Sequence, residues 1–130
     1  MQEKINKLKQ LKILFVEDEE DLLSIISDAL TKLQANFITA VNGVDALEVI
    51  EANSDIDIIV TDINMPHMNG LELLEKLSNK GIKIPVIIMS AHTETEYINQ
   101  AKDYGVTEYL LKPFDFIEFI DLVASLDLKK

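Results

Sequence analysis

Five short apolar runs alternate with longer stretches of helical periodicity along this chain of 130 residues. The runs are rich in β-branched residues and show no strict apolar–polar alternation, which is typical of strands covered on both faces of a parallel sheet. They occupy residues 12–17, 37–41, 56–62, 84–90 and 108–111. The pattern predicts repeated β–α–β units, and therefore a three-layer α/β domain around a five-stranded parallel sheet.

The stretches between the runs place apolar residues at three- and four-residue steps, which is the spacing of one helix face. In the first stretch this stripe consists of Leu22, Leu23, Ile26, Leu30 and Leu33. Glycines follow two of the stretches, at positions where helices commonly end. We therefore expect helices over residues 19–34, 44–52, 71–79, 95–104 and 114–128.

Residues 1–11 stand apart from this pattern, with Ile5, Leu8 and Leu11 at three-residue steps. A short extra helix, the tail of a signalling helix and a cloning remnant are alternatives, and we favour a partly ordered terminus. No linker, repeat or low-complexity tract interrupts the remainder. The chain is therefore divided into an N-terminal extension, 1–11, and one domain, 12–128.

The composition excludes several classes of protein. Acidic residues outnumber lysines by 23 to 12 and arginine is absent, which argues against direct binding of nucleic acid, since such binding neutralises phosphates. The absence of cysteine excludes disulfides and thiolate-ligated metals. No apolar run approaches the ~20 residues that cross a bilayer, and the N-terminus lacks a signal-peptide core. We expect a single cytoplasmic domain without direct membrane contact.

Polar residues stand where four of the five runs end. The first run ends in Glu17 and Asp18, the third in Asp62 and the fourth in Ser90, while Lys112 follows the fifth. Sites in open parallel sheets form where the carboxyl ends of the strands meet their outgoing loops. Three carboxylates, a hydroxyl and an ammonium are therefore expected at one edge of the sheet.

This combination indicates phosphoryl chemistry. Crowded carboxylates repel one another unless a cation joins them, and hard oxygen ligands at a strand edge suit Mg²⁺. An aspartate beside a metal and an ammonium is a nucleophile towards an electrophilic phosphorus. Metal, ammonium and hydroxyl together stabilise charge on phosphoryl oxygens. The residues thus suggest formation of an acyl phosphate on aspartate.

At this point the chain resembles the receiver domain of two-component response regulators of the CheY type. The resemblance is carried by the segments ILFVEDEE, VTDINMPHMNG, PVIIMSAH and GVTEYLLKPF, and covers about residues 11–128. Each segment alone is a weak signal, whereas all four in order at strand ends are highly specific. The resemblance implies a flavodoxin-like, doubly wound (βα)5 fold with strand order 2-1-3-4-5, the order known for CheY.

The resemblance also assigns roles to the acids. Asp62 is the implied phosphoacceptor. Glu17, Asp18, Asp62 and the backbone carbonyl of Asn64 are the implied ligands of Mg²⁺, with Mn²⁺ as an alternative. Glu17 occupies a position where many receivers carry aspartate, and it is expected to act through water. The alternative for this acidic stretch is an N-cap followed by first-turn acids that favour the helix dipole.

The resemblance further implies that Ser90 bonds a phosphoryl oxygen and that Lys112 pairs with Asp62 and then with its phosphate. The Lys112–Pro113 peptide bond is expected to be cis, as X–Pro bonds permit at small cost. An ordinary helix start with proline in its first turn is compatible with this.

Two further positions are implied to regulate the site. Tyr109 matches the switch aromatic, which turns inward after phosphorylation and reshapes the face formed by residues 95–104, 108–111 and 114–128. The alternative is a half-buried tyrosine on an edge strand. His92 stands where receivers tune hydrolysis, and a loop histidine without a chemical role is an equal alternative.

The expected function is a phosphorylation switch that accepts a phosphoryl group from a histidine kinase or phosphotransfer protein and changes its binding face for an effector. On this interpretation it is no enzyme beyond its own phosphorylation and dephosphorylation. We expect the unphosphorylated protein to be a monomer, because the acidic last helix lacks the arginine pairs of receiver dimers.

Three alternatives belong to other classes. A pseudo-receiver binds partners without phosphate, but such domains usually lack the acceptor, an acid or the lysine. A phosphohydrolase of the haloacid-dehalogenase type needs a second Asp two residues after the nucleophile, where this chain has Asn64. A flavodoxin is disfavoured because acids, rather than a Ser/Thr-rich phosphate loop, end the first run.

Overall fold

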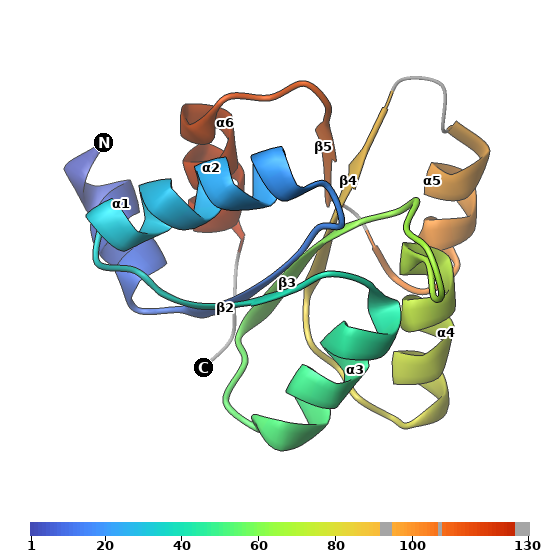
Figure 1. Ribbon diagram of the computed structural model, residues 1–130. Coiled ribbons are helices and arrows are strands. Elements are labelled where there is room, and N and C mark those ends of the chain that lie inside the picture. Colours follow the sequence, from blue (N-terminus) through green and yellow to red (C-terminus); the bar gives the residue numbers. More distant parts are fainter. Residues whose placement is uncertain (92–94, 107, 127–130) are drawn as a thin grey trace.

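The computed structural model describes residues 1–91, 95–106 and 108–126. Five parallel strands form one sheet in the order β2-β1-β3-β4-β5, with helices on both faces (Figure 1). The strands are Lys12–Val16 (β1), Asn36–Ala40 (β2), Ile58–Asp62 (β3), Val86–Ser90 (β4) and Glu108–Leu111 (β5). The predicted three-layer, doubly wound fold and its strand order are confirmed.

The helices follow the strands in alternation, with one extra helix at the start. They are Gln2–Lys9 (α1), Glu20–Lys32 (α2), Gly43–Ala52 (α3), Gly70–Asn79 (α4), Thr95–Lys102 (α5) and Phe116–Ser125 (α6). The fourth strand begins two residues later than predicted, because Pro85 has no N–H to donate to the neighbouring strand. The last predicted helix was too long, since Asp115 forms the N-cap of α6.

Strand alternation sends neighbouring side chains to opposite faces of the sheet. On one face, Phe15 and Val60 pack with residues of α1, α2 and α6. On the other face, Leu14 and Ile59 pack with residues of α3 and α4. A smaller cluster around Ile88 joins α4 to α5. The carboxyl ends of the strands therefore emerge between two helical layers, as Figure 1 shows.

The N-terminal segment is a helix, so the expectation of a partly ordered terminus was wrong. Leu8 is fully buried and Leu11 nearly so, and both belong to the main core cluster. The three-residue spacing of Ile5, Leu8 and Leu11 is the inward face of α1 and of its connection to β1. Of the alternatives considered, the short extra helix is the one observed.

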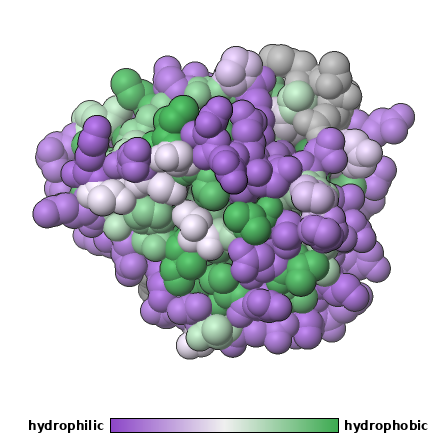
Figure 2. Space-filling view, in the orientation of Figure 1, coloured by the Kyte–Doolittle hydropathy of each residue, from purple (hydrophilic) through white to green (hydrophobic). Residues whose placement is uncertain are grey.

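Figure 2 shows hydrophilic residues over most of one side of the molecule, with apolar residues between them. Over the part of the chain that the structure describes, none of the helices combines the length and apolarity that crossing a membrane requires.

Candidate functional site

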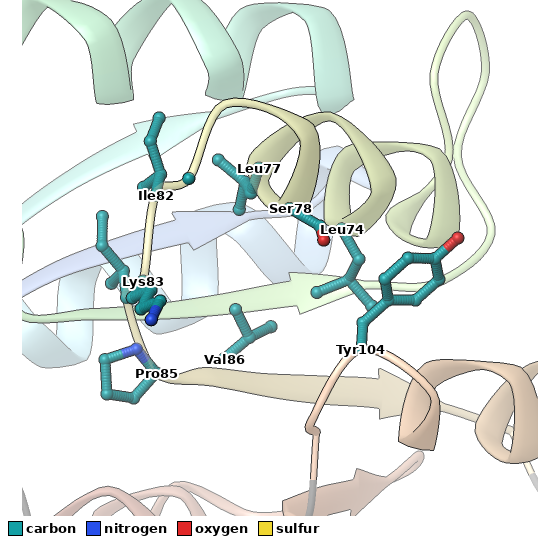
Figure 3. Close-up of a pocket in the computed structure, with 10 residues that line it drawn as sticks. Leu74, Leu77, Ser78, Ile82, Lys83, Pro85, Val86 and Tyr104 are labelled. Carbon is teal, nitrogen blue, oxygen red and sulfur yellow. The ribbon is translucent and has the colours of Figure 1, made fainter.

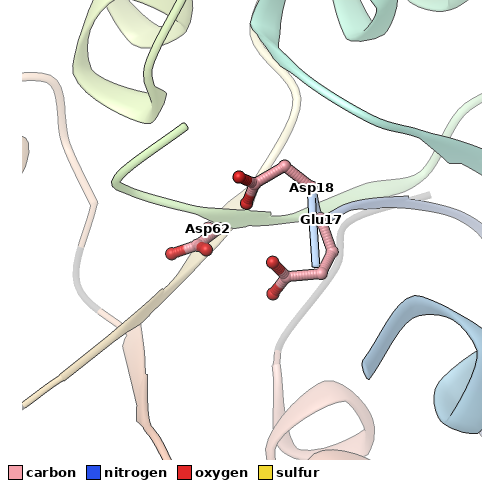
Figure 4. Close-up of side chains that lie close together, drawn as sticks. All are labelled: Glu17, Asp18 and Asp62. Carbon is pink, nitrogen blue, oxygen red and sulfur yellow. The ribbon is translucent and has the colours of Figure 1, made fainter. Parts of the chain in front are cut away.

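Three acidic side chains lie together at the carboxyl edge of the sheet. Glu17 and Asp18 directly follow β1, and Asp62 is the last residue of β3, the strand next to β1. One carboxylate oxygen from each residue lies within 4.8 Å of the others. Figure 4 shows the three carboxylates converging on one region. The predicted acidic cluster is therefore present in the fold.

Lys112 joins two of these acids. Its Nζ donates to Glu17 Oε1 at 2.7 Å and to Asp62 Oδ2 at 2.9 Å. We expected the contact with Asp62 from the resemblance, but not the shorter contact with Glu17. Burial lowers the pKa of Lys112, but hydrogen bonds to both carboxylates outweigh this effect and raise the pKa above its usual value. The lysine is thus a fixed positive charge at neutral pH.

Glu17 is fully buried and both of its carboxylate oxygens have partners. Oε1 accepts from Lys112, and Oε2 accepts from the backbone N–H of Glu19 at 3.0 Å. Burial raises the pKa of Glu17 to about 7; the hydrogen bond from Lys112 opposes this rise and the charge of Asp62 adds to it. Glu17 does not cap the following helix, because Glu19 occupies the N-cap of α2.

Asp18 and Asp62 differ in exposure. Asp18 is exposed, whereas Asp62 retains only 6% of its accessible surface. Asp62 Oδ1 accepts a long hydrogen bond of 3.4 Å from the backbone N–H of Asn64, two residues along the loop. The side chain of Asn64 is exposed. The cluster is therefore open to solvent on the Asp18 side and closed beneath Glu17.

Ser90 ends β4, which neighbours β3. It is fully buried, and among the described residues its Oγ is the one buried side-chain polar atom without a hydrogen-bond partner. Its carbonyl accepts from the backbone N–H of Lys112 at 2.8 Å, which ties the ends of β4 and β5 together. A buried hydroxyl without a partner costs free energy, and an incoming oxygen ligand relieves that cost.

These groups fit a small hard cation. The donors are all carboxylate oxygens, their spacing permits one ion to contact all three residues, and Asp18 gives access from solvent. Mg²⁺ is bound in this way by one or two carboxylates with several waters retained. Glu17, Asp18 and Asp62 are therefore the residues that would hold Mg²⁺ or Mn²⁺, together with the implied carbonyl of Asn64.

Glycine at two positions shapes the loop after Asp62. A Cβ at Gly70 would lie 2.7 Å from the carbonyl oxygen of Asp62 and 2.9 Å from Cα of Ile63. A Cβ at Gly43 would lie 2.6 Å from the carbonyl oxygen of Met68. The contact at Gly43 joins two separate loops, the contact at Gly70 joins the two ends of the loop between β3 and α4, and no local sequence pattern indicates either one.

The remaining predicted residues lie around the cluster. The Lys112–Pro113 peptide bond is cis, the isomer that the resemblance implied. Tyr109 is half-buried, and its hydroxyl donates to the carbonyl of Val106 at 2.8 Å. This position agrees with either reading of Tyr109, as a switch or as an edge-strand tyrosine. His92 lies outside the described residues.

A cavity of about 460 Å³ lies at the amino end of β4. The acidic cluster lies at the opposite edge of the sheet, where the strands end. Figure 3 shows the cavity between the end of α4, the segment that enters β4, and Tyr104 after α5. Its walls include Leu77 and Pro85, and none of its lining residues is one of the predicted site residues. It opens at the amino end of β4, whereas Ser90 lies at the carboxyl end.

Comparisons with known proteins agree with this geometry. Residues 13–124 match the family described as the response regulator receiver domain. The chain is 42% identical over 101 residues to the Regulator of RpoS of Escherichia coli K12, which covers 78% of this chain and 30% of that protein. It is 36% identical over 107 residues to Chemotaxis protein CheY1 of Helicobacter pylori J99, covering 80% of this chain and 86% of that protein.

A solved structure shows the same similarity. The receiver domain of the Francisella response regulator 1452 has a TM-score of 0.76 and 33% identity, covering 85% of this chain and 91% of that one. The match thus spans 30% of the length of the Regulator of RpoS, but 86% of the length of Chemotaxis protein CheY1.

Proposed function

The chain belongs to the receiver-domain family of response regulators, and on this premise we propose that it is a phosphorylation switch that accepts a phosphoryl group on Asp62. The observation that carries the proposal is the setting of Asp62. Its carboxylate ends β3 almost buried, receives a hydrogen bond from Lys112, and lies within 4.8 Å of two further acids. Such a setting suits a nucleophile that must meet a polyanionic donor.

The phosphoryl donor is a phosphohistidine of a sensor kinase or of a phosphotransfer protein. A carboxylate oxygen of Asp62 forms the new P–O bond while the P–N bond of the donor breaks, and the electron pair of that bond returns to the imidazole. Bound Mg²⁺ supplies positive charge that offsets the charge on the phosphoryl oxygens. Lys112 donates to one phosphoryl oxygen from its place beside Asp62, since its ammonium is already within hydrogen-bond distance.

Ser90 also contributes to this step. Its unpartnered Oγ donates to a phosphoryl oxygen, so that the free energy of its buried hydroxyl falls when the phosphoryl group arrives. Tyr109 gives up its bond to Val106 as the output face changes. The changed output face then binds an effector protein or domain. On this proposal the protein turns over no substrate besides its own phosphate.

Two alternatives are separable by experiment. A phosphate-independent binding module is disfavoured because the acceptor, both acids and the lysine are present and assembled. A phosphohydrolase is disfavoured because Asn64, two residues after Asp62, has no proton to exchange as an acid or base.

The proposal is tested by incubating the protein with Mg²⁺ and acetyl phosphate and following its intact mass. One phosphoryl group per chain is expected, with none on Asp62→Asn and none without the metal. Turnover of a phosphomonoester under the same conditions would support the hydrolase instead. Unchanged affinity of Asp62→Asn for the effector, and of the wild type with and without phosphate, would support the binding module.

A further inference from the structure

Helix α1 lies outside the part of the chain that matches the receiver-domain family, which begins at residue 13. Its side chains nevertheless belong to the core. Leu8 is fully buried and clusters with Phe15 of β1 and Phe119 of α6. Figure 1 shows α1 near α6, and the two helices contact each other. The helix is therefore a packed part of this domain that the family match does not include.

Two lysines of α1 hold the second half of α6. Lys4 Nζ lies 2.8 Å from Asp121 Oδ1, and Lys7 Nζ donates to the carbonyl of Leu126 at 3.0 Å. Leu126 is the C-cap residue of α6, and α6 has no basic residue in its own last turn. Cations stabilise the negative end of a helix. Lys7 thus supplies from α1 the charge that α6 lacks.

The first half of α6 is attached to the acidic site. The N-cap of α6 lies three residues after Lys112. Phe114 and Phe116 stack on Phe119 with centroid distances of 6.5 and 5.6 Å, and Phe119 meets Phe15 edge-on at 5.9 Å. Phe15 belongs to β1, the strand that carries the acidic pair. α6 therefore follows Lys112 closely in the chain at its start, packs on β1 through Phe119, and contacts α1 in its second half.

We propose that α1 and Asp62 are energetically coupled through α6, so that a phosphoryl group on Asp62 loosens α1. The coupling rests on the proposed function. Lys112 contacts Asp62 directly without phosphate, and a phosphoryl group on that carboxylate draws the ammonium outward to new oxygens. The loop between Lys112 and α6 moves with it. A packed helix shifts as a unit, so the contacts of Lys4 and Lys7 at its far end are strained.

Coupling of this kind is reciprocal. If a ligand at Asp62 loosens α1, then weakening the attachment of α1 must tighten binding of that ligand by a corresponding factor. Beryllofluoride is a suitable probe, because it is a non-covalent phosphoryl analogue whose binding with Mg²⁺ is an equilibrium. The affinity can therefore be compared between variants without reference to rates of phosphorylation.

The first arm measures hydrogen exchange with and without Mg²⁺ and beryllofluoride. Amides of residues 2–11 are expected to exchange about fivefold faster or more when the probe is bound, in keeping with usual coupling energies. Amides of α3, on the opposite face of the sheet, serve as the internal reference. Asp62→Asn should show no change. Unchanged or slower exchange in α1 of the wild type, with the probe bound, would overturn the coupling.

The second arm measures the affinity for beryllofluoride by calorimetry in Lys4→Ala/Lys7→Ala. Severalfold tighter binding than in the wild type is expected. Lys9→Ala is the matched control, because Lys9 is an exposed lysine of the same helix for which the described residues show no ion pair. Equal or weaker affinity in the double variant would overturn the coupling.

A third variant separates this inference from the function on which it rests. Absence of beryllofluoride binding to the wild type would contradict phosphorylation of Asp62. Lys112→Ala then decides the coupling without any ligand, because it removes the contact of Lys112 with Asp62 directly. Faster exchange in α1 relative to α3 supports the coupling, and exchange equal to that of the wild type rejects it.

Discussion

The ammonium of Lys112 lies 2.7 Å from Glu17 Oε1, and this ion pair joins the ends of β1 and β5. Glu17 is fully buried, so the pair is shielded from water on the glutamate side. Asp62 shares the same ammonium from β3, the strand beside β1. A single lysine thus connects two acids that would otherwise repel each other.

The raised pKa of Glu17 makes the metal-free protein less stable as the pH rises. The pKa of this carboxyl group is about 7 in the folded protein, against the ordinary value of 4.5 that is expected in the unfolded chain. Its protonated form therefore stabilises the fold fully below pH 4.5, and this contribution is lost as the pH rises through 7. The expected loss in the free energy of unfolding is on the order of 3 kcal/mol. Urea unfolding with EDTA at pH 5 and pH 8 measures it. Glu17→Gln should lack this loss, and an equal loss in both proteins would contradict the assignment.

Binding of Mg²⁺ should release a proton near pH 7, because metal ligands must be deprotonated. Since the pKa of Glu17 is about 7, roughly half a proton per ion is expected at that pH. Calorimetry in two buffers with different ionisation enthalpies measures the number released. Glu17→Gln should release almost none, and equal release from both proteins would show that the proton comes from elsewhere.

Asp18→Asn should lower the affinity for Mg²⁺ by at least about tenfold while changing the free energy of unfolding little, since Asp18 is an exposed member of the acidic cluster. Asp21→Asn is the matched control, because Asp21 is an exposed acid in the first turn of α2 outside the cluster. Titration with Mg²⁺ followed by NMR provides both affinities. Similar losses in the two variants would indicate a diffuse electrostatic effect instead of a defined site.

Ser90→Ala should separate stability from function. No hydrogen bond of Ser90 Oγ is lost on substitution, so the unphosphorylated variant should be as stable as the wild type or more stable by about 1 kcal/mol. Its phosphorylation by acetyl phosphate should nevertheless be slower. Urea unfolding and intact-mass kinetics measure the two effects. A marked loss of stability would mean that the hydroxyl already has a partner.

Gly70→Ala should impair the site, because a Cβ there would lie within 3 Å of the backbone of Asp62 and Ile63. We expect a loss of stability above 1 kcal/mol and slower phosphorylation. Gly81→Ala is the control: Gly81 has a φ of +70° and open space around it, so alanine there should cost about 1 to 2 kcal/mol and leave phosphorylation unchanged. Equal phosphorylation rates in both variants would show that the close packing at Gly70 does not position Asp62.

The sequence predicted the strand ends well because each one is the end of an apolar run. Asp62 closes a run of buried β-branched residues, and Ser90 closes another, so their positions at the carboxyl edge follow from the parallel sheet. Prediction was weaker at the strand starts. The fourth run appeared to begin at Ile84, but Pro85 withholds its N–H and pairing begins at Val86.

Contacts between distant segments were less predictable. The hydrogen bond between Glu17 and Lys112 joins residues 95 positions apart. The sequence pattern brings Lys112 to the acidic edge of the sheet, but it does not say whether Lys112 contacts Asp62, Glu17 or both. The N-terminal helix was considered only as an alternative, for a related reason. Two apolar residues, Ile5 and Leu8, are a weak signal in an eight-residue helix, and short helices depend on tertiary packing, here the burial of Leu8 against α6.

The site of phosphorylation is the central claim, and peptide mapping tests it most directly. The protein is treated with Mg²⁺ and acetyl phosphate, the acyl phosphate is trapped by borohydride reduction, and the modified residue is located by tandem mass spectrometry. The account predicts modification at Asp62 alone, lost in Asp62→Asn and strongly reduced in Lys112→Ala. Modification of another residue, or none under conditions where Mg²⁺ binds, would contradict it.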